Sequence, residues 1–172
     1  MMVTWLRESK WSAGILALLR VWLGYTWITS GWGKITEGFQ SAGFLKGAVA
    51  KATGDHPAVQ SWWASFIEGF ALPNSAFFDI LIPWGEFLVG IALIAGLLTT
   101  FAGLMGIVMN FAFLFSGTTS INPQMVLFTF FLLVAGRNAG RYGLDAYVLP
   151  FLDKWFHREH EMTIHKGKSK AS

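Results

Sequence analysis

Cysteine is absent from this chain of 172 residues, and only 13% of the residues are charged. The missing thiols exclude disulfide bonds, thiolate zinc sites, cysteine-ligated iron–sulfur clusters and a catalytic cysteine within this chain. A soluble domain usually carries about 25% charged residues, so roughly half of the usual solvating charge is missing. This composition excludes a disordered chain and argues against an ordinary water-soluble enzyme.

Cofactor-binding motifs are absent as well. Gly31-x-Gly33 is not followed by x-x-Gly and no predicted strand precedes it, so the dinucleotide fingerprint is missing, and no Walker motif occurs. No histidine lies in a predicted apolar span, and the histidines near the C-terminus lack the spacing of a metal site. We therefore expect no haem, flavin, nicotinamide or metal.

The residues that are present are typical of a bilayer protein: 53% are hydrophobic, with nine Trp, sixteen Phe and nineteen Gly, and the mean hydropathy is +0.48. A membrane-spanning helix needs about 20 mostly apolar residues. Four segments approach this length, at about 11–33, 76–98, 100–116 and 123–140. The sequence predicts an all-α membrane protein, a single domain over 1–156 built as an up-down bundle of four transmembrane helices.

Two amphipathic segments are expected outside these spans. In the long extracytoplasmic loop 34–75, aromatic side chains recur every four residues from Trp62 to Phe70. This spacing predicts a short amphipathic helix, either on the outer surface or across the bundle as a lid. A second amphipathic segment is expected on the inner side at 143–156, followed by a polar cytoplasmic tail, 157–172, that is predicted to be disordered.

Basic residues set the expected orientation. Seven of the thirteen Lys and Arg residues lie from Arg137 onward, whereas the long loop contains only three. Short segments rich in Lys and Arg stay on the cytoplasmic side of a membrane, so both termini are expected in the cytoplasm, as four spans require. The net charge of +3 therefore belongs to a juxtamembrane tail and does not predict nucleic-acid binding.

Charged side chains inside the predicted spans are the first candidates for a functional site. Each costs about 2.5–3.5 kcal/mol on insertion scales, so such charges normally pair and face inward. Arg20, Glu86, Asn110 and Thr129 come from the four spans, and they lie at similar depths when the helical rise is counted from the cytoplasmic ends. We predict a central polar cluster in which Arg20 and Glu86 form a charge-assisted pair.

A polar and aromatic strip is predicted to lead from this cluster to the outer surface. Its members are Trp27, Trp84, Asp79 and Lys34. Glu86 could exchange a proton, Arg20 could hold an anionic oxygen, and the indole rings could stack on a planar ring. These groups suit a quinone head-group pocket or a path for a small anion. The alternative is an ion pair that only fixes the register of the helices.

Several short motifs follow one another along the predicted membrane part of the chain. They are Arg20-x-x-x-Gly24, Gly31-x-Gly33-Lys34, Gly85-Glu86 with Gly90, Asn110, and Ala139-Gly140-Arg141-Tyr142-Gly143-Leu144-Asp145 ahead of Val148-Leu149-Pro150. Together they resemble the DoxX/DoxD family of four-helix membrane proteins, over about residues 12–150. The long Trp-rich loop before the second span is more similar to the DoxD-like branch.

The resemblance implies a plasma-membrane protein of redox metabolism. The DoxD-like branch is the large subunit of thiosulfate:quinone oxidoreductase, which oxidises thiosulfate to tetrathionate, passes electrons to quinone and works with a separate small subunit. The family pattern carries over as positions, without catalytic roles, to Arg20, Lys34, Glu86, Asn110, Arg141 and Asp145. From their spacing, Arg141 and Asp145 are expected to form an i, i+4 ion pair at the inner surface.

Three functions remain open at this point. The first is a quinone-linked redox subunit, with Glu86 and Arg20 as the catalytic candidates. In this function the quinone-binding candidates are Lys34, Asn110, Trp27, Trp84 and Asp79. The second is a transporter of a small anion or of protons along the polar strip, and the third is an assembly or anchor subunit without catalysis. The expected partners are the lipid bilayer, a small redox subunit and further copies of the chain.

Overall fold

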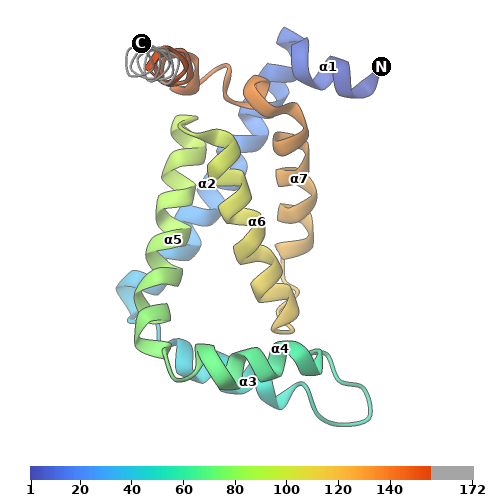
Figure 1. Ribbon diagram of the computed structural model, residues 1–172, viewed down its shortest axis with the longest axis vertical. Helices are drawn as coiled ribbons and strands as arrows, with labels where there is room; N and C mark the ends of the chain where they lie inside the picture. The colour runs from blue at the N-terminus through green and yellow to red at the C-terminus, as the bar shows by residue number, and fades with distance from the viewer. Residues whose placement is uncertain (156–172) are drawn as a thin grey trace, which may run out of the picture.

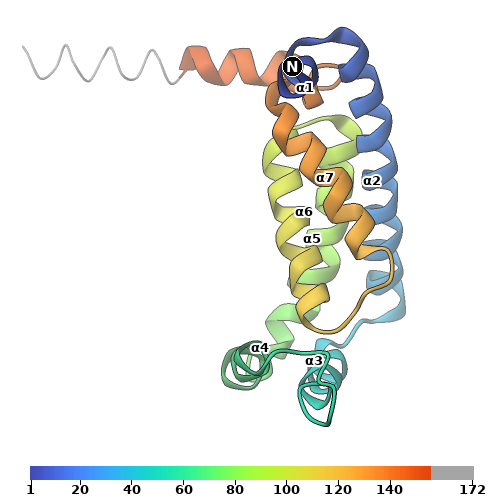
Figure 2. The same ribbon diagram turned by 90° about the vertical axis from the view of Figure 1, so that its right-hand side faces the viewer.

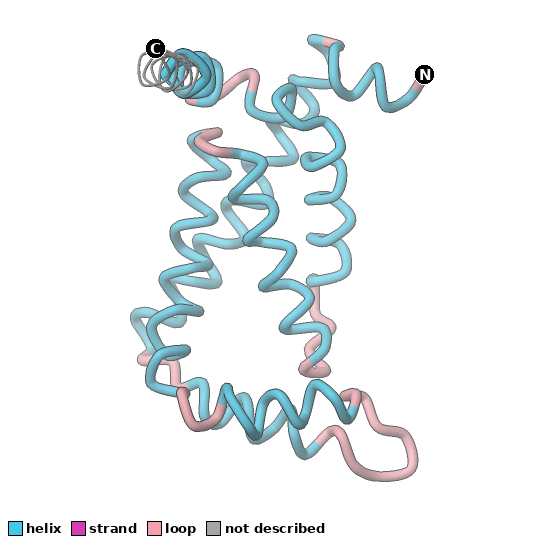
Figure 3. Tube along the Cα trace, in the orientation of Figure 1, coloured by secondary structure: helices cyan, strands magenta, loops and turns pink. Residues whose placement is uncertain are grey.

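The computed structural model describes residues 1–155, and this part of the chain is helical almost throughout (Figure 3). No strand occurs between residues 1 and 155, in agreement with the predicted all-α fold. The tail predicted to be disordered, 157–172, lies outside the described residues.

Four long helices lie side by side and run alternately in opposite directions (Figures 1 and 2). They are α2 (Lys10–Glu37), α5 (Ser75–Ala95), α6 (Thr99–Phe115) and α7 (Asn122–Ala135), which continues into a 3-10 turn, η2 (Gly136–Gly140). These helices cover the four apolar segments of the sequence. The connection from α5 to α6 is very short because Gly96, with a φ of +64°, ends α5 in the left-handed conformation.

Glycines bring α2 and α5 into close backbone contact. A Cβ atom on Gly31 would lie 2.6 Å from the main-chain nitrogen of Phe87 and 2.7 Å from the carbonyl oxygen of Pro83. Two turns away, Gly24 and Gly90 meet in the same way, and a Cβ on either would lie 2.7 Å from the carbonyl oxygen of the other. Small residues at such positions allow close van der Waals packing of helices. They set the register of α2 against α5.

Three short elements lie across one end of the bundle, which we call the α3 end (Figures 1 and 2). They are α3 (Ser41–Ala50), α4 (Ser61–Phe66) and a π-helical turn, η1 (Ile67–Ala71). The helix predicted around Trp62 to Phe70 is confirmed. It is held to the bundle by a 2.9 Å hydrogen bond that the Trp63 indole donates to Ser116 Oγ. The sequence analysis did not predict α3.

The opposite end of the bundle, which we call the α1 end, carries α1 (Met2–Glu8) and the helical residues 145–155 (Figures 1 and 2). Asn138 in η2 donates hydrogen bonds to the carbonyl oxygens of Leu6 and Ser9, at 2.8 and 3.0 Å. These bonds hold α1 against the bundle. The helix at 145–155 corresponds to the second predicted amphipathic segment.

Large apolar side chains cover the outside of all four long helices. Exposed examples are Leu18 and Tyr25 on α2, Ile80, Trp84 and Leu88 on α5, Phe101 and Val108 on α6, and Leu127 and Phe130 on α7. By length and mean hydropathy, one helix among the described residues, α5, meets the criteria for crossing a bilayer, and α6 is a shorter apolar helix. The sides of the bundle are therefore far more apolar than those of a water-soluble helix bundle, whose exposed faces are polar.

Candidate functional site

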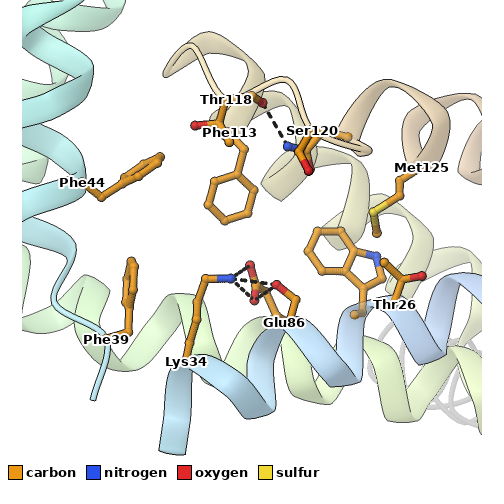
Figure 4. Close-up of a pocket in the computed structure, with 12 residues that line it drawn as sticks. Thr26, Lys34, Phe39, Phe44, Glu86, Phe113, Thr118, Ser120 and Met125 are labelled. Atoms are coloured by element: carbon orange, nitrogen blue, oxygen red, sulfur yellow. Dashed lines mark hydrogen bonds and ion pairs between the residues drawn. The ribbon is translucent and has the colours of Figure 1, made fainter. Parts of the chain in front are cut away.

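A cavity of about 260 Å³ lies between the long helices close to the α3 end (Figure 4). Its walls combine charged, aromatic and hydroxyl-bearing side chains. The lining residues are Thr26, Trp27, Ser30, Lys34, Phe39, Phe44, Glu86, Phe113, Thr118, Ser120, Asn122 and Met125. We call it the Lys34–Glu86 cavity, after the ion pair in its wall.

Lys34 on α2 and Glu86 on α5 form this ion pair. Lys34 Nζ lies 2.7 Å from Glu86 Oε2 and donates to Oε1 at 3.0 Å. Ser30, one helical turn before Lys34, donates its hydroxyl to Glu86 Oε2 at 2.9 Å and accepts from Lys34 Nζ at 2.7 Å. The Lys34 side chain is 24% exposed and that of Glu86 only 1%, so the cation is the more accessible partner.

Aromatic rings flank the Lys34 ammonium group. Nζ lies 5.5 Å from the ring centroid of Phe113 and 6.0 Å from that of Phe39, within the range of cation–π attraction. Figure 4 shows Phe39 and Phe44 on one side of the ion pair, Phe113 above it and Met125 on the other side. Apolar walls around a small number of polar groups are typical of sites for small molecules.

Four buried side chains have polar atoms without a hydrogen-bond partner among the described residues. These atoms are Nε of Arg20, Nε1 of Trp27, Oγ1 of Thr99 and both amide atoms of Asn110. Of these four residues Trp27 lines the cavity, whereas Asn110, which was expected there, does not. An unpaired buried polar group costs about 1–3 kcal/mol. Most buried polar groups in native proteins are paired, with protein or with bound molecules. The indole nitrogen of Trp27 faces Gly106 of α6, where a Cβ atom would lie 3.2 Å from it, so its unpaired state reflects the packing of α2 against α6 and is not evidence of a ligand.

Arg20 does not pair with Glu86, so that prediction is wrong. Its two terminal nitrogens donate to main-chain carbonyl oxygens instead, Nη1 to Ala139 at 3.1 Å and Nη2 to Tyr142 at 2.9 Å. The guanidinium group packs so closely against Gly96 that no Cβ could be accommodated there. Arg20 on α2 is therefore joined to the C-terminal segment and lies against the end of α5, away from the cavity.

The error has a simple geometric cause. The predicted depths assumed that the first two spans begin and end at the same level. In the structure α2 extends well beyond the end of α5, so that Arg20 lies beside Gly96, immediately after the last residue of α5. The residue that meets Glu86 is Lys34, which lies about 21 Å further along α2 at 1.5 Å per residue.

Asp145 does not form the predicted i, i+4 pair with Arg141. Its carboxylate accepts hydrogen bonds from the main-chain nitrogens of Leu98 and Thr99, at 2.6 and 2.9 Å, and so caps the first turn of α6. Among residues 1–155, the side chain of Arg141 makes one long hydrogen bond, of 3.5 Å, to the Glu8 carbonyl oxygen. The i, i+4 geometry is missing because residues 141–144 form turns and bends, and the helix begins only at Asp145.

Two further predicted site residues lie outside the cavity. Asp79 accepts a hydrogen bond at 2.6 Å from the main-chain nitrogen of Ser41 and caps α3. Trp84 is 47% exposed on the outside of α5, where its ring contacts Phe87. The predicted polar strip therefore does not form.

The predicted central cluster does not form either. Thr129 donates its hydroxyl to the Met125 carbonyl oxygen at 2.7 Å, and neither Thr129 nor Asn110 is bonded to Arg20 or Glu86 in the described part of the chain. Of the nine predicted site residues, the cavity brings together Lys34, Glu86 and Trp27.

Sequence reasoning missed several residues of the cavity. Ser30 had a recognisable signal, because it lies one turn before Lys34 on the same helix face. Phe39 and Phe113 had none, since their position depends on how the α3 end folds back over the bundle.

A comparison with protein families finds that the model of the DoxX family matches residues 15–119. The match includes Arg20, Lys34, Glu86 and Asn110, and it ends before α7 and the stretch around Asp145. No curated protein and no solved structure matches the chain in the comparisons made with them.

Proposed function

The chain belongs to the DoxX family, a family of membrane proteins, and from this premise we propose that it is a quinone-linked redox subunit of the plasma membrane. In this proposal the Lys34–Glu86 cavity binds the quinone head group. The four long helices cross the bilayer, and both termini lie in the cytoplasm.

The apolar exterior of all four long helices supports four spans. From Trp11 to Trp32, both exposed, α2 rises about 32 Å, which is close to the thickness of the hydrocarbon core of a bilayer, about 30 Å. An even number of spans puts the termini on one side, and the basic residues from Arg137 onward favour the cytoplasm. The α3 end would then face outward and the α1 end inward.

The observation that carries the quinone proposal is the ion pair in the wall of an otherwise largely apolar cavity. Reduction of a quinone requires a proton for each carbonyl oxygen, and Glu86 with its partner Lys34 is a group that can exchange protons there. The ammonium group can also bind a carbonyl oxygen, while the rings of Phe39 and Phe113 flank a planar ligand. Pockets for drug-sized molecules measure about 300–1,000 Å³, so a cavity slightly below this range suits a single ring.

The resemblance to the DoxD-like branch supplies the electron donor in this proposal. Two thiosulfate ions yield one tetrathionate ion and two electrons, and a quinone takes up two electrons and two protons to become a quinol. In this chain the side chains of Lys34 and Glu86 would bind the quinone and exchange the protons. Thiosulfate would be oxidised with the help of a separate small subunit.

Transport along the bundle is the second function considered, and the packing favours a local site instead. Between the level of Glu86 and that of Arg20, completely buried apolar side chains, among them Leu23 and Leu93, fill much of the interior. Thr129 and Asn110 add isolated polar groups to the bundle interior, and the Thr129 hydroxyl is already bonded to the Met125 carbonyl oxygen. A path for an anion or proton would need polar groups along its whole length, and the apolar side chains interrupt it. The third function is an assembly or anchor subunit, in which the ion pair would be purely architectural. Such a role would not explain the accessible cavity beside Lys34.

The test is quinone binding by the purified full-length protein in lipid nanodiscs, with decylubiquinone as the probe in equilibrium dialysis. We expect saturable binding by the wild-type protein, and at least tenfold weaker binding by Glu86→Gln, because a charge-assisted contact is worth about 1.5–3 kcal/mol. Thiosulfate-dependent reduction of the quinone, measured with membrane extract added back, should be lost in the same variant.

Asp153→Asn is the matched control, because it breaks another ion pair, the one between Arg137 and Asp153, far from the cavity. It should bind quinone like the wild type. Equal binding by Glu86→Gln and the wild type would show that the quinone site is elsewhere. Absence of binding by the folded wild-type protein, combined with anion or proton flux in liposomes, would replace the proposal by transport.

A further inference from the structure

A second cavity, of about 290 Å³, lies at the α1 end between α1, η2 and the helix at 145–155. Three arginines from separate segments line it: Arg7 on α1, Arg137 in η2 and Arg141 just after η2. We call it the arginine cavity. It lies at the opposite end of the bundle from the Lys34–Glu86 cavity, so the proposed quinone site does not account for it.

The arginines keep much of their hydrogen-bonding capacity for a ligand. Within residues 1–155, Arg7 uses only Nε, which donates to the Val134 carbonyl oxygen at 2.9 Å. Arg141 makes only its long contact of 3.5 Å through Nη1. Arg137 is paired with Asp153 at 2.9 Å, but its side chain is still largely exposed. Guanidinium groups with free edges are the preferred protein partners of phosphate oxygens.

The acidic group in the wall does not neutralise this cavity. Asp145 also lines it, but its two carboxylate oxygens already accept the main-chain N–H groups of Leu98 and Thr99. The positive charge of Arg20 also attracts this carboxylate. Even with Asp153 paired to Arg137 and with the charge of Asp145 counted, the three arginines leave the arginine cavity with an excess of positive charge.

The arginine cavity is held in shape before any ligand binds. Asn138, also in its wall, ties α1 to η2 through hydrogen bonds to Leu6, Ser9 and the Ser12 hydroxyl. Because these bonds fix α1, Arg7 stays close to the other two arginines. A site formed in advance loses less conformational entropy when it binds its ligand.

The surroundings place the arginine cavity at the surface of the bilayer. Trp5 and Trp11 near the N-terminus and Tyr147 and Phe151 on the C-terminal helix are exposed around the same end. Aromatic side chains gather at the level of the lipid headgroups. In the orientation proposed above, on which this inference rests, that level belongs to the cytoplasmic leaflet, whose anionic lipids bind basic pockets between helices.

We propose that the arginine cavity binds the phosphate group of an anionic phospholipid of the inner leaflet. Arg7 and Arg141 hold the phosphate oxygens, and Arg137 adds charge at the rim. The acyl chains extend along the apolar sides of the bundle. Neither quinone binding nor redox chemistry is needed for this interaction.

The experiment uses the purified full chain in an uncharged detergent and short-chain lipids as probes. Dihexanoyl phosphatidylglycerol, dihexanoyl phosphatidylcholine and inorganic phosphate are titrated separately, and binding is followed by calorimetry. We expect saturable binding of phosphatidylglycerol at least tenfold tighter than that of the zwitterionic lipid or of inorganic phosphate. Arg141→Gln and Arg7→Gln should each weaken it about tenfold, as the loss of a charge-assisted contact requires.

Two further variants make the test specific. Lys46→Gln removes one positive charge from an exposed position on α3, at the other end of the molecule, and should leave lipid binding unchanged. Ala146→Glu places a carboxylate in the arginine cavity at an exposed position without removing any arginine contact, and should abolish binding. It keeps the test valid even if an arginine variant fails to fold.

Several outcomes would overturn the proposal. Equal affinity for the two lipids, or equal weakening by Lys46→Gln and Arg141→Gln, would mean that binding is not specific to this cavity. Binding of inorganic phosphate as tight as that of phosphatidylglycerol would overturn the lipid as the ligand. Because the readout contains no quinone, failure of the quinone proposal would leave a positive result here intact.

Discussion

The protein buries charged side chains at both ends of its bundle, and the two ends use them differently. At the α3 end, Lys34 and Glu86 pair with each other and form part of a cavity wall. At the α1 end, the terminal nitrogens of Arg20 and both carboxylate oxygens of Asp145 bind main-chain groups. We call this second arrangement the Arg20–Asp145 junction.

The comparison shows that a buried charge is not by itself evidence of a functional site. In both regions, removing the charged side chains from water costs free energy. In the junction these side-chain hydrogen bonds connect the C-terminal segment to α2 and to the start of α6, so the charges stabilise the fold. In the Lys34–Glu86 cavity the pair keeps an accessible side, so the charges can act on a ligand. The following predictions test this division.

The largest effect is expected from Asp145→Ala, which breaks the junction. This variant leaves the Arg20 guanidinium buried without its nearby negative charge and leaves two main-chain N–H groups at the start of α6 unpaired. Each buried donor that is left without its acceptor costs about 1–3 kcal/mol, so the loss of two such bonds should lower the stability by several kcal/mol. Thermal unfolding in detergent, with size-exclusion chromatography to count folded protein, measures the loss.

The quinone affinity of the folded fraction of Asp145→Ala should be the same as that of the wild type, because the Lys34–Glu86 cavity is at the other end. A variant that melts at the wild-type temperature would show that the junction does not stabilise the fold. A folded variant with weakened quinone binding would show that the two ends are coupled.

The second prediction concerns the contact that aligns the two charged partners of the cavity. Gly31→Leu places a side chain where the backbone of α5 already lies, so α2 and α5 must separate. Overpacking of this kind typically costs about 1–3 kcal/mol, and here it should also pull Lys34 away from Glu86 and weaken quinone binding. Gly33→Ala is the control, because a Cβ at Gly33 meets no atom within 4 Å. Equal melting temperatures for the two variants would contradict the close packing of α2 and α5.

The third prediction replaces the ion pair of the cavity by apolar side chains of similar size, in the double variant Lys34→Met with Glu86→Leu. Such replacements of buried pairs are often neutral or stabilising because no charge is left unpaired. We expect a melting temperature equal to or above that of the wild type, together with complete loss of quinone binding. If the double variant instead unfolds easily, the pair has an architectural role and the division between the two ends fails.

The sequence was sufficient to predict the helical architecture. Apolar segments of the right length predicted where α2, α5, α6 and α7 lie, and a four-residue aromatic period predicted the helix that crosses the α3 end. These signals are local, since helix formation depends on residues three and four positions apart. The short helix α3 lacks such a period and was missed.

The site was predicted only in part, because it depends on the register between helices. Glu86 was identified as a buried carboxylate that needs a partner, but the choice of Arg20 over Lys34 rested on an assumed alignment of helix ends. That alignment is set by the contacts of Gly31 and Gly90, which only the folded structure shows. In the same way, Asp145 was assigned to Arg141 because the turn at 141–144, which removes their helical spacing, left no clear signal in the sequence.

The smallest effect is expected at the exposed ion pair between Arg137 and Asp153, which provides the reference for the two buried arrangements. Arg137 and Asp153 lie 2.9 Å apart, but their side chains are 72% and 45% exposed. Water already solvates both partners, so pairs of this kind contribute little to stability. Asp153→Asn should therefore melt at the wild-type temperature and bind decylubiquinone with wild-type affinity. We attribute the role of an ion pair in this protein to its burial and to whether it lines a cavity. A marked loss of thermal stability or of quinone affinity in Asp153→Asn would contradict this, because it would show that a short distance between the charges is sufficient.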